Sequence, residues 1–229
     1  MNQEDLVIVG SNTNCGKTII TGLLLRYLRE QHINAISQKW IQTGNKSFSS
    51  DLEKHFKLAK INKEEIKPYL KLLNPYCFKF PGSPHLASSL EHKTIEQTKI
   101  CKSYFALKEY FELILVESAG GVLVPYNKNK FIIDIAKKLS LIALVVIDNK
   151  LGAINNALLT IETLKKRRIP ILGLIFNQTQ KNESKIILED NPKTVQLISK
   201  VKVLGCLPFE KDPELLFAAF KSIWSRNIS

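Results

Sequence analysis

The stretch from Gly10 to Thr18 reads GSNTNCGKT, and its residue types are suited to binding phosphate. An apolar run at residues 6–9 precedes it and an amphipathic stretch at 16–30 follows, which predicts a loop between a strand and a helix. In that setting backbone N–H groups at the helix start hold phosphate oxygens, Lys17 reaches the β- and γ-phosphates, and the Thr18 hydroxyl binds Mg²⁺. Five residues, rather than the usual four, separate Gly10 from Gly16. The strand-to-helix context nevertheless argues against a chance match.

Charged side chains further along the chain could complete a phosphoryl-transfer site. Lys39, at the end of an expected strand, could place a second cation near the transferred group, although a solvated lysine is the plain alternative. Asp51 and Glu117 could join Thr18 as oxygen ligands of Mg²⁺. Asp51 could equally cap the helix that follows it. Glu117 ends an apolar run, where an unpaired carboxylate is costly. The pattern indicates an enzyme that uses ATP.

Apolar runs alternate with helical patterns along the chain. Strands are expected at residues 6–9, 35–38, 112–117, 141–147, 169–176 and near Val203, and helices at 16–30, 51–59, 94–111, 131–139, 154–166 and 213–224. Residues 74–83, rich in Pro, Phe and Tyr, are expected to form an ordered loop. Continuously apolar strands that alternate with helices predict an α/β fold with a mostly parallel sheet, covered by helices on both faces.

In such a fold the loops at the C-terminal ends of the strands hold the site. Five polar or glycine-containing segments fall at such ends: 10–18, 39–44, 117–121, 150–156 and 177–178. Their convergence at one edge is stronger evidence for a site than any single motif.

The 229-residue chain is 45% hydrophobic, which is sufficient for one large domain over residues 1–229. The N-terminus lacks the pattern of a secretory signal, and no apolar run is long enough for a membrane span. The four cysteines are scattered without a CxxC pair, so we expect a reduced, cytoplasmic setting. The net charge of +12 comes from dispersed lysines, so we expect no nucleic-acid partner.

Several motifs, in order and at similar spacing, resemble those of dethiobiotin synthetases. The loop at 10–18 resembles GTDTxVGKT, KWIQTG at 39–44 resembles KPVxTG, and Ser50-Asp51 matches the segment that carries an acidic Mg²⁺ ligand. NPYCF at 74–78 and PGSPH at 81–85 resemble the NPY-F and SPH segment of the family. VESAGG at 116–121 is similar to VEGAGG, KLGAIN at 150–155 to KLGxxN, and LGCLP at 204–208 to LGxIP.

The resemblance implies a single-domain, three-layer fold of the P-loop NTPase type and a Mg²⁺- and ATP-dependent ligase of biotin biosynthesis. A diamine, 7,8-diaminononanoate, would take up CO₂ to form a carbamate, ATP would phosphorylate the carbamate, and the second amine would displace phosphate to close the ring. Lys17 and Lys39 would be catalytic, and the metal would bind Thr18, Asp51 and Glu117. The nucleotide would contact Asn14, Cys15, Gly16, Lys17, Thr18, Ile19, Asp51, Glu117, Ser118, Ala119, Gly120, Asn177, Gln178, Pro208, Phe209, Glu210 and Glu214. The substrate would contact Thr43, Gly152 and Asn155.

Gly152 and Asn155 lie where a buried strand leads into a helix, and the N-terminal end of a helix favours an anion. The ATP phosphates already have the loop at 10–18, so the substrate carboxylate is the candidate ligand. An ordinary strand-to-helix turn is the plain alternative. In the family this helix start comes from the neighbouring subunit, so the resemblance implies a homodimer.

The chain departs from the family pattern at Asn12, Cys15, Trp40 and Ser118, which stand for Asp, Val, Pro and Gly. None removes a charged group that the chemistry needs, but Trp40 could reshape the substrate pocket. Asn12 also stands where partition-type ATPases carry an extra Lys, which argues against that class. Two alternatives stay open. One is a cobyrinate amidotransferase, which normally adds a glutaminase domain for which the chain has no room. The other is a non-catalytic nucleotide switch.

Overall fold

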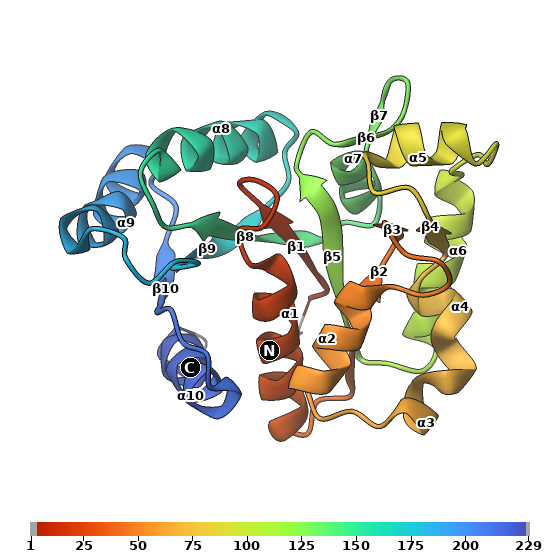
Figure 1. Ribbon diagram of the computed structural model, residues 1–229, viewed down its shortest axis with the longest axis horizontal. Coiled ribbons are helices and arrows are strands. Elements are labelled where there is room, and N and C mark those ends of the chain that lie inside the picture. Colours follow the sequence, from red (N-terminus) through yellow and green to blue (C-terminus); the bar gives the residue numbers. More distant parts are fainter. Residues whose placement is uncertain (1–3, 228–229) are drawn as a thin grey trace.

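The computed structural model describes residues 4–227, and its centre is a parallel sheet of six strands in the order β10-β9-β8-β1-β5-β2 (Figure 1). Its strands, nearly all built from runs of apolar residues, are β1 (Leu6–Gly10), β2 (Ala35–Lys39), β5 (Leu113–Gly121), β8 (Ile142–Asp148), β9 (Ile171–Asn177) and β10 (Val203–Leu207). Strands of this composition are stable where helices cover both faces of the sheet. The expected α/β class is therefore confirmed.

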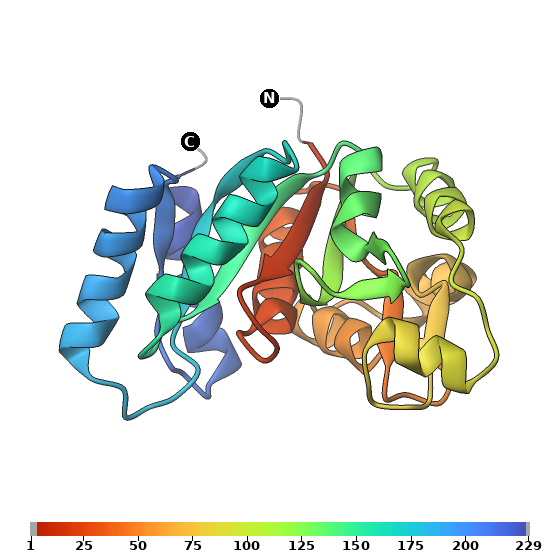
Figure 2. The same cartoon turned by 90° about the horizontal axis from the view of Figure 1, so that it is seen from above.

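Helices cover the two faces of the sheet and make three layers (Figure 2). One face carries α1 (Lys17–Glu30), α2 (Ser50–Leu58) and α10 (Pro213–Ser225), and the other carries α7 (Ile132–Lys138), α8 (Ala153–Lys166) and α9 (Lys185–Ser199). At the β2 edge, α6 (Gln97–Lys108) packs beside α4 (Leu70–Leu73) and β5. Among residues 4–227, no helix combines the length and the apolar character that a membrane crossing requires.

Shorter elements extend the sheet edge that carries the site. A parallel pair, β3 (Ile41–Thr43) and β4 (Tyr76–Phe78), follows β2, and an antiparallel pair, β6 (Pro125–Asn127) and β7 (Lys130–Phe131), follows β5. The remaining helices are short and lie between β3 and α6: α3 (Lys63–Ile66), the 3₁₀ helix η1 (Lys67–Tyr69) and α5 (Pro84–Leu90).

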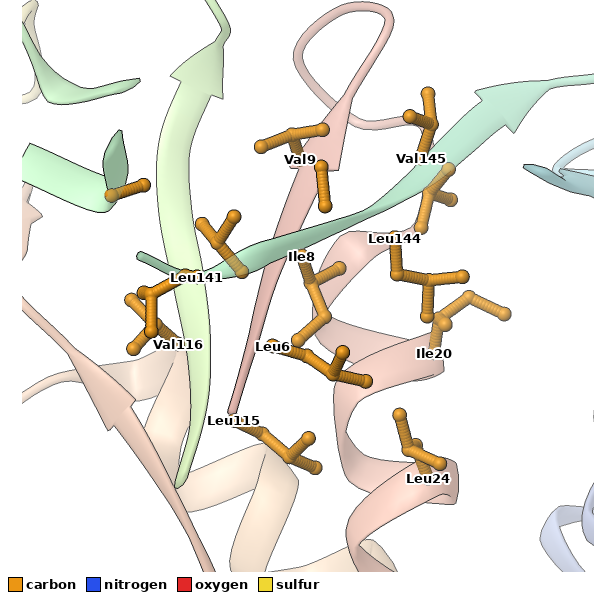
Figure 3. Packing of buried hydrophobic residues seen from close by; sticks show 14 of the residues in the cluster. Leu6, Ile8, Val9, Ile20, Leu24, Leu115, Val116, Leu141, Leu144 and Val145 are labelled. Carbon is orange, nitrogen blue, oxygen red and sulfur yellow. The ribbon is translucent and has the colours of Figure 1, made fainter. Parts of the chain in front are cut away.

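The hydrophobic core lies on both sides of β1, which is the strand that leads into the phosphate loop. Ile8 of β1, Leu144 of β8 and Ile20 of α1 are fully buried, and Figure 3 shows them gathered between the sheet and the helix. Burying each such side chain contributes about 1.5–3 kcal/mol before the cost of chain ordering. The core therefore fixes the position of the strand end and of the first turn of α1.

The structure corrects several expected boundaries. β5 does not end at Glu117 but continues to Gly121, because Gly121 pairs with Gly10 of β1. The segment at 74–83 is not only a loop, since it contains β4. The helix expected at 94–111 is shorter at both ends, because α6 begins at Gln97 and ends at Lys108. The N-cap of α2 is Ser49, whose Oγ accepts from Leu52 N at 3.2 Å, so Asp51 is not the cap.

One long helix, α9, has no counterpart among the helices expected from the sequence, because Pro192 lies inside it. Proline leaves the carbonyl of residue i−4, here Leu188, without its helical donor. The side chain of Asn149 donates to that carbonyl at 3.0 Å. Asn191 in turn donates to Asn149 Oδ1 at 2.9 Å. A neighbouring loop thus satisfies the group that the proline would orphan.

Candidate active site

The phosphate loop joins β1 to α1 at the C-terminal edge of the sheet, as the sequence predicts. Gly16 is the N-cap of α1 with φ at +99°, a conformation that glycine adopts without strain. A Cβ at this position would lie 2.0 Å from Asn177 Nδ2. Asn177 also donates to the carbonyl of Cys15 at 3.0 Å. Asn177, at the end of β9, therefore fixes the position of the loop. The first N–H groups of α1 have no acceptor within the helix.

A cavity of about 360 Å³ opens in front of this loop. It brings together residues that lie far apart in the sequence, from β2, β3, α2 and β5. Of the residues expected to form the site, those that line it are Asn14, Gly16, Lys17, Thr18, Ile19, Lys39, Thr43, Asp51, Glu117, Ala119 and Gly120. The phosphate loop and the two acidic residues thus share one cavity with Lys39.

Lys39 lies between the two carboxylates. Its Nζ is 2.6 Å from Glu117 Oε1 and 2.8 Å from Asp51 Oδ2, and it donates to the Ser118 carbonyl at 3.2 Å. Burial alone lowers the pKa of Lys39, but Glu117 and Asp51 more than offset this, so its pKa is raised above 10.5. The solvated alternative for Lys39 is therefore wrong, since the side chain is only 5% exposed.

Glu117 is 2% exposed and is held by several groups at once. Oε1 contacts Lys39 and accepts from Thr18 Oγ1 at 3.3 Å, while Oε2 is 2.7 Å from His55 Nε2. Burial raises the pKa of Glu117, but Lys39 and His55 outweigh it and hold the pKa well below its usual range. The carboxylate is therefore charged at neutral pH.

His55 is the functional neighbour that sequence reasoning missed. It is fully buried on α2, and its Nδ1 lies 3.1 Å from Ser37 Oγ of β2. Its position four residues after Asp51 puts both side chains one helical turn apart, which is the signal that could have found it. Ile41, Gln42 and Lys54 also line the cavity without having been expected there.

Several expected nucleotide residues lie outside the cavity. Cys15 and Ser118 are buried, at 0% and 3% exposure. Gln178 and Pro208 line a second hollow of about 410 Å³, where Gln178 N donates to Leu207 O at 2.9 Å. Phe209 and Glu210 follow in the loop before α10, and Glu210 Oε1 accepts from two backbone N–H groups of that loop. Glu214 lies on α10, where it pairs with Arg26 at 2.6 Å.

The expected carboxylate-binding residues are also outside the cavity of their own chain. Gly152 is the exposed N-cap of α8 with φ at +87°, and Asn155 is exposed one turn further on. Trp40 does not reshape the cavity, because its side chain is 1% exposed and its Nε1 donates to Gln38 Oε1 at 2.8 Å. The indole is part of the core beneath the site.

Comparison with known proteins places the chain in a family. A family model described as an AAA domain matches residues 4–214. The ATP-dependent dethiobiotin synthetase BioD of Halalkalibacterium halodurans is 32% identical over 219 residues, which cover 92% of this chain and 87% of that protein. The chain belongs to the ATP-dependent dethiobiotin synthetase family. The synthetase of Clostridium perfringens is 33% identical over 93% of both chains, and that of Methanococcus vannielii is 31% identical over 90% of this chain and 94% of the relative. These relatives do not favour the cobyrinate amidotransferase alternative.

Solved structures share the fold. A ParA family ATPase from Chlorobium tepidum matches with a TM-score of 0.57 and 12% identity, over 99% of this chain and 93% of that one. A chain of the MinC:MinD cell division protein complex of Aquifex aeolicus matches with a TM-score of 0.58 and 16% identity, over 98% of this chain and 95% of that one. At this identity the likeness shows the fold alone.

Proposed function

We propose that this chain closes the cyclic urea of dethiobiotin from 7,8-diaminononanoate, CO₂ and ATP. The observation that carries the proposal is the cavity in which the Lys39 ammonium faces the phosphate loop, in a member of the dethiobiotin synthetase family. One amine of the substrate adds to CO₂ and gives a carbamate. A carbamate oxygen then takes the γ-phosphoryl group of ATP and releases ADP. The second amine attacks the carbonyl carbon, and phosphate leaves as the ring closes.

Two fixed cations suit this reaction, because negative charge builds up between a carbamate and a triphosphate. Lys17 is 6% exposed at the start of α1 and is proposed to bind the β- and γ-phosphates. Lys39 is proposed to face the transferred phosphoryl group, with Thr43 beside it to hydrogen-bond the carbamate or an amine. Asp51, Glu117 and the Ser118 carbonyl hold the Lys39 ammonium in place before any reaction takes place.

Mg²⁺ is the proposed metal, and Thr18, Asp51 and Glu117 would hold it. Their oxygens fit this ion, because one hydroxyl and two carboxylates converge on the cavity from α1, α2 and β5. Among residues 4–227 no three His, Cys, Asp or Glu side chains form a metal cluster, so phosphates and water would complete the shell. The ion would neutralise charge on the phosphates during transfer.

The rest of the nucleotide is proposed to lie along the loops that follow β9 and β10. Asn177 joins these loops to the phosphate loop through the Cys15 carbonyl. Gln178 and Pro208 line one hollow at that edge, and Phe209 and Glu210 continue the same loop. The carboxylate of Glu214 already pairs with Arg26 and Lys60. Glu214 is therefore proposed to contact the nucleotide only through its position at the start of α10, and not through its carboxylate.

A homodimer is proposed because the expected carboxylate site lies outside the cavity of its own chain. Gly152 and Asn155 are exposed at the start of α8. Leu151 and Leu159 beside them are 79% and 55% exposed, and a hollow of about 290 Å³ lies between α8 and the turn after β5. An exposed apolar surface next to an open helix start is suited to a second copy that shares its site.

We also propose that the chain forms one domain and that its setting is cytoplasmic. One domain is supported by a single hydrophobic cluster that runs from Leu6 to Trp224. A cytoplasmic setting is supported by the four thiols, all of which are free.

The test is a direct assay with purified protein, 7,8-diaminononanoate, bicarbonate and MgATP, with dethiobiotin measured by mass spectrometry. We expect ADP, phosphate and dethiobiotin in equal amounts. Omission of the diamine is the control, and ADP release that ignores the diamine would contradict the proposal. The same assay with other nucleoside triphosphates measures nucleotide preference.

A further inference from the structure

A chain of buried polar groups leads from β2 through α2 to the carboxylate of Glu117. Ser37 Oγ lies 3.1 Å from His55 Nδ1, and His55 Nε2 lies 2.7 Å from Glu117 Oε2. Ser37 and His55 are both 0% exposed, and Glu117 is 2% exposed. The three residues come from three different elements, so the arrangement depends on the packing of α2 against the sheet.

The order of a hydroxyl, an imidazole and a carboxylate resembles a nucleophilic triad, but this one cannot act on a substrate. A nucleophile must meet the reacting atom, and neither Ser37 nor His55 lines the cavity or is exposed. The chain of contacts instead ends on Glu117, which does line the cavity. Its effect must therefore pass through that carboxylate.

The chemistry of the groups fixes the direction of the hydrogen bond to Glu117. A carboxylate oxygen can only accept, so His55 Nε2 must donate to Oε2. Nδ1 is left for the hydroxyl of Ser37, which fixes the ring orientation. With Oε2 engaged behind the cavity, only Oε1 faces Lys39 Nζ at 2.6 Å and Thr18 Oγ1 at 3.3 Å.

We propose that His55 is a positioning residue that engages one oxygen of Glu117 and thereby presents the other oxygen alone to the metal. The inference rests on the proposed binding of Mg²⁺ by Thr18, Asp51 and Glu117. Asp51 lies one turn before His55 on α2, so one rigid helix sets the position of both carboxylates. Partners behind a metal ligand typically contribute 10- to 100-fold to metal affinity, because they hold the ligand in its binding orientation.

The test measures how strongly magnesium and nucleotide bind together, and it needs no turnover. Isothermal titration calorimetry with a non-hydrolysable ATP analogue gives the affinity with and without Mg²⁺, and the ratio of the two is the coupling. We expect His55→Leu to lower this coupling by about tenfold or more while it leaves the magnesium-free affinity unchanged. His55→Gln should keep most of the coupling, since its amide can donate from near the position of Nε2. His55→Asn should not, because its amide reaches only the Ser37 side.

Two controls separate a positioning role from other outcomes. Thermal unfolding of each variant without ligand measures stability, and a merely structural role would lower the melting temperature with the coupling unchanged, which would overturn the inference. Glu117→Gln tests the carboxylate itself. If Glu117→Gln lowers the coupling but His55→Leu and His55→Asn do not, the inference about His55 is wrong. The proposed set of metal ligands is then still supported. If none of them changes it, the proposed metal set fails and the inference fails with it. If His55→Leu does not fold, the inference is tested by comparing the coupling of His55→Gln with that of His55→Asn.

Discussion

At the scale of single residues, the two lysines of the cavity have different surroundings. Lys39 Nζ is within 2.8 Å of two carboxylates, and its raised pKa keeps it a cation at neutral pH. Lys17 Nζ has the Asn12 carbonyl of its own loop at 3.4 Å. These different partners suit the different roles proposed for the two lysines, because only Lys17 belongs to the loop proposed to hold the phosphates.

Alanine at each lysine should separate binding from turnover. We expect Lys17→Ala to weaken ATP binding and abolish turnover. Lys39→Ala should keep much of the ATP affinity and lower kcat by about 10²–10³, the usual effect of removing a group that stabilises transition-state charge. Lys54→Ala is the matched control, because Lys54 lines the same cavity but is exposed. Calorimetry and steady-state kinetics measure the two effects, and an equal loss of ATP affinity at positions 17 and 39 would contradict the division of roles.

Gly16 has a positive φ and also lies in close contact with the side chain of Asn177. Gly16→Ala should abolish nucleotide binding, because a Cβ would lie 2.0 Å from Asn177 Nδ2 and would displace the loop. Gly152→Ala is the control: φ is +87° there, and nothing lies within 4 Å of the added Cβ. It should cost only the conformational strain of about 1–2 kcal/mol and leave ATP affinity unchanged. Fluorescence titration with a labelled nucleotide measures both, and unaltered binding by Gly16→Ala would rule out the contact as the reason for this glycine.

At the scale of secondary-structure elements, α9 depends on a side chain outside it. Asn149 follows β8, is 3% exposed, and joins the Leu188 carbonyl to the Asn191 amide. Asn149→Ala would remove the donor of the part-buried Leu188 carbonyl and leave the buried Asn191 amide with only the Lys150 carbonyl. We expect a loss of unfolding free energy of about 1–3 kcal/mol. Urea unfolding followed by circular dichroism measures it, with Asn182→Ala in an exposed loop as the control. A loss no larger than that of the control would show that water replaces Asn149.

The elements that the sequence predicts well are those with uninterrupted apolar patterns, such as β1, β8 and α1. α9 could not be predicted from its own residues, because the donor that allows Pro192 comes from Asn149. The end of β5 could not be predicted either, since Gly120 and Gly121 carry no side-chain pattern and their place in the strand follows from pairing with β1. In the site, Lys39 and Glu117 were predictable because each charged residue lies at the end of a strand expected from the sequence. Their direct contact was not, because it depends on the register of β2 against β5.

At the scale of the whole molecule, Arg26 of α1 forms a link to the last helix, α10. Arg26 is 9% exposed and donates to both carboxylate oxygens of Glu214, at 3.0 and 2.6 Å. Its guanidinium also lies 3.8 Å from the centre of the Phe217 ring. Hydrogen bonds from Arg26, and to a smaller extent from Lys60, lower the pKa of Glu214 from 4.5 to about 2. The Arg26–Glu214 pair therefore adds to the packing of α10, which also rests on its buried aromatic side chains and on the Lys221–Glu30 pair at 3.2 Å.

The pairing of Glu214 with Arg26 predicts that the stability of the folded chain decreases as the pH falls into the acidic range. Because the pKa of Glu214 is lower in the folded chain, its contribution to stability is present above pH 4.5 and is lost as the pH falls toward about 2. We expect the difference in urea midpoint between the wild type and Glu214→Gln to be constant from neutral pH down to about 5 and to shrink below that. Glu214 is exposed, so added salt should reduce the difference at neutral pH. A difference that grows in acid would contradict the assignment.

The proposed dimer makes a prediction about mixed subunits. Each site would take Lys17 from one chain and Asn155 from the other, so Lys17→Ala and Asn155→Asp should each be inactive alone. After the two variants are unfolded together and refolded, half of the dimers would be mixed and would contain one intact site. We expect about a quarter of wild-type activity. Mixing Lys17→Ala with Lys39→Ala is the control that should restore nothing, because both residues belong to the same chain. A protein that turns over normally as a monomer at assay concentration would exclude the idea.

β1 leaves the ribosome long before the strands that flank it. It ends at Gly10, whereas its neighbours begin at Leu113 and Ile142, and Asn177, which holds the phosphate loop, comes later still. During synthesis the first strand therefore waits without partners, and its apolar side chains are open to chaperones. The loop proposed to bind phosphate is among the first segments to be made, yet the hydrogen bond that it receives from Asn177 can form only after β9 has emerged. A chain interrupted before the end of β9 would therefore carry this loop without the Asn177 contact.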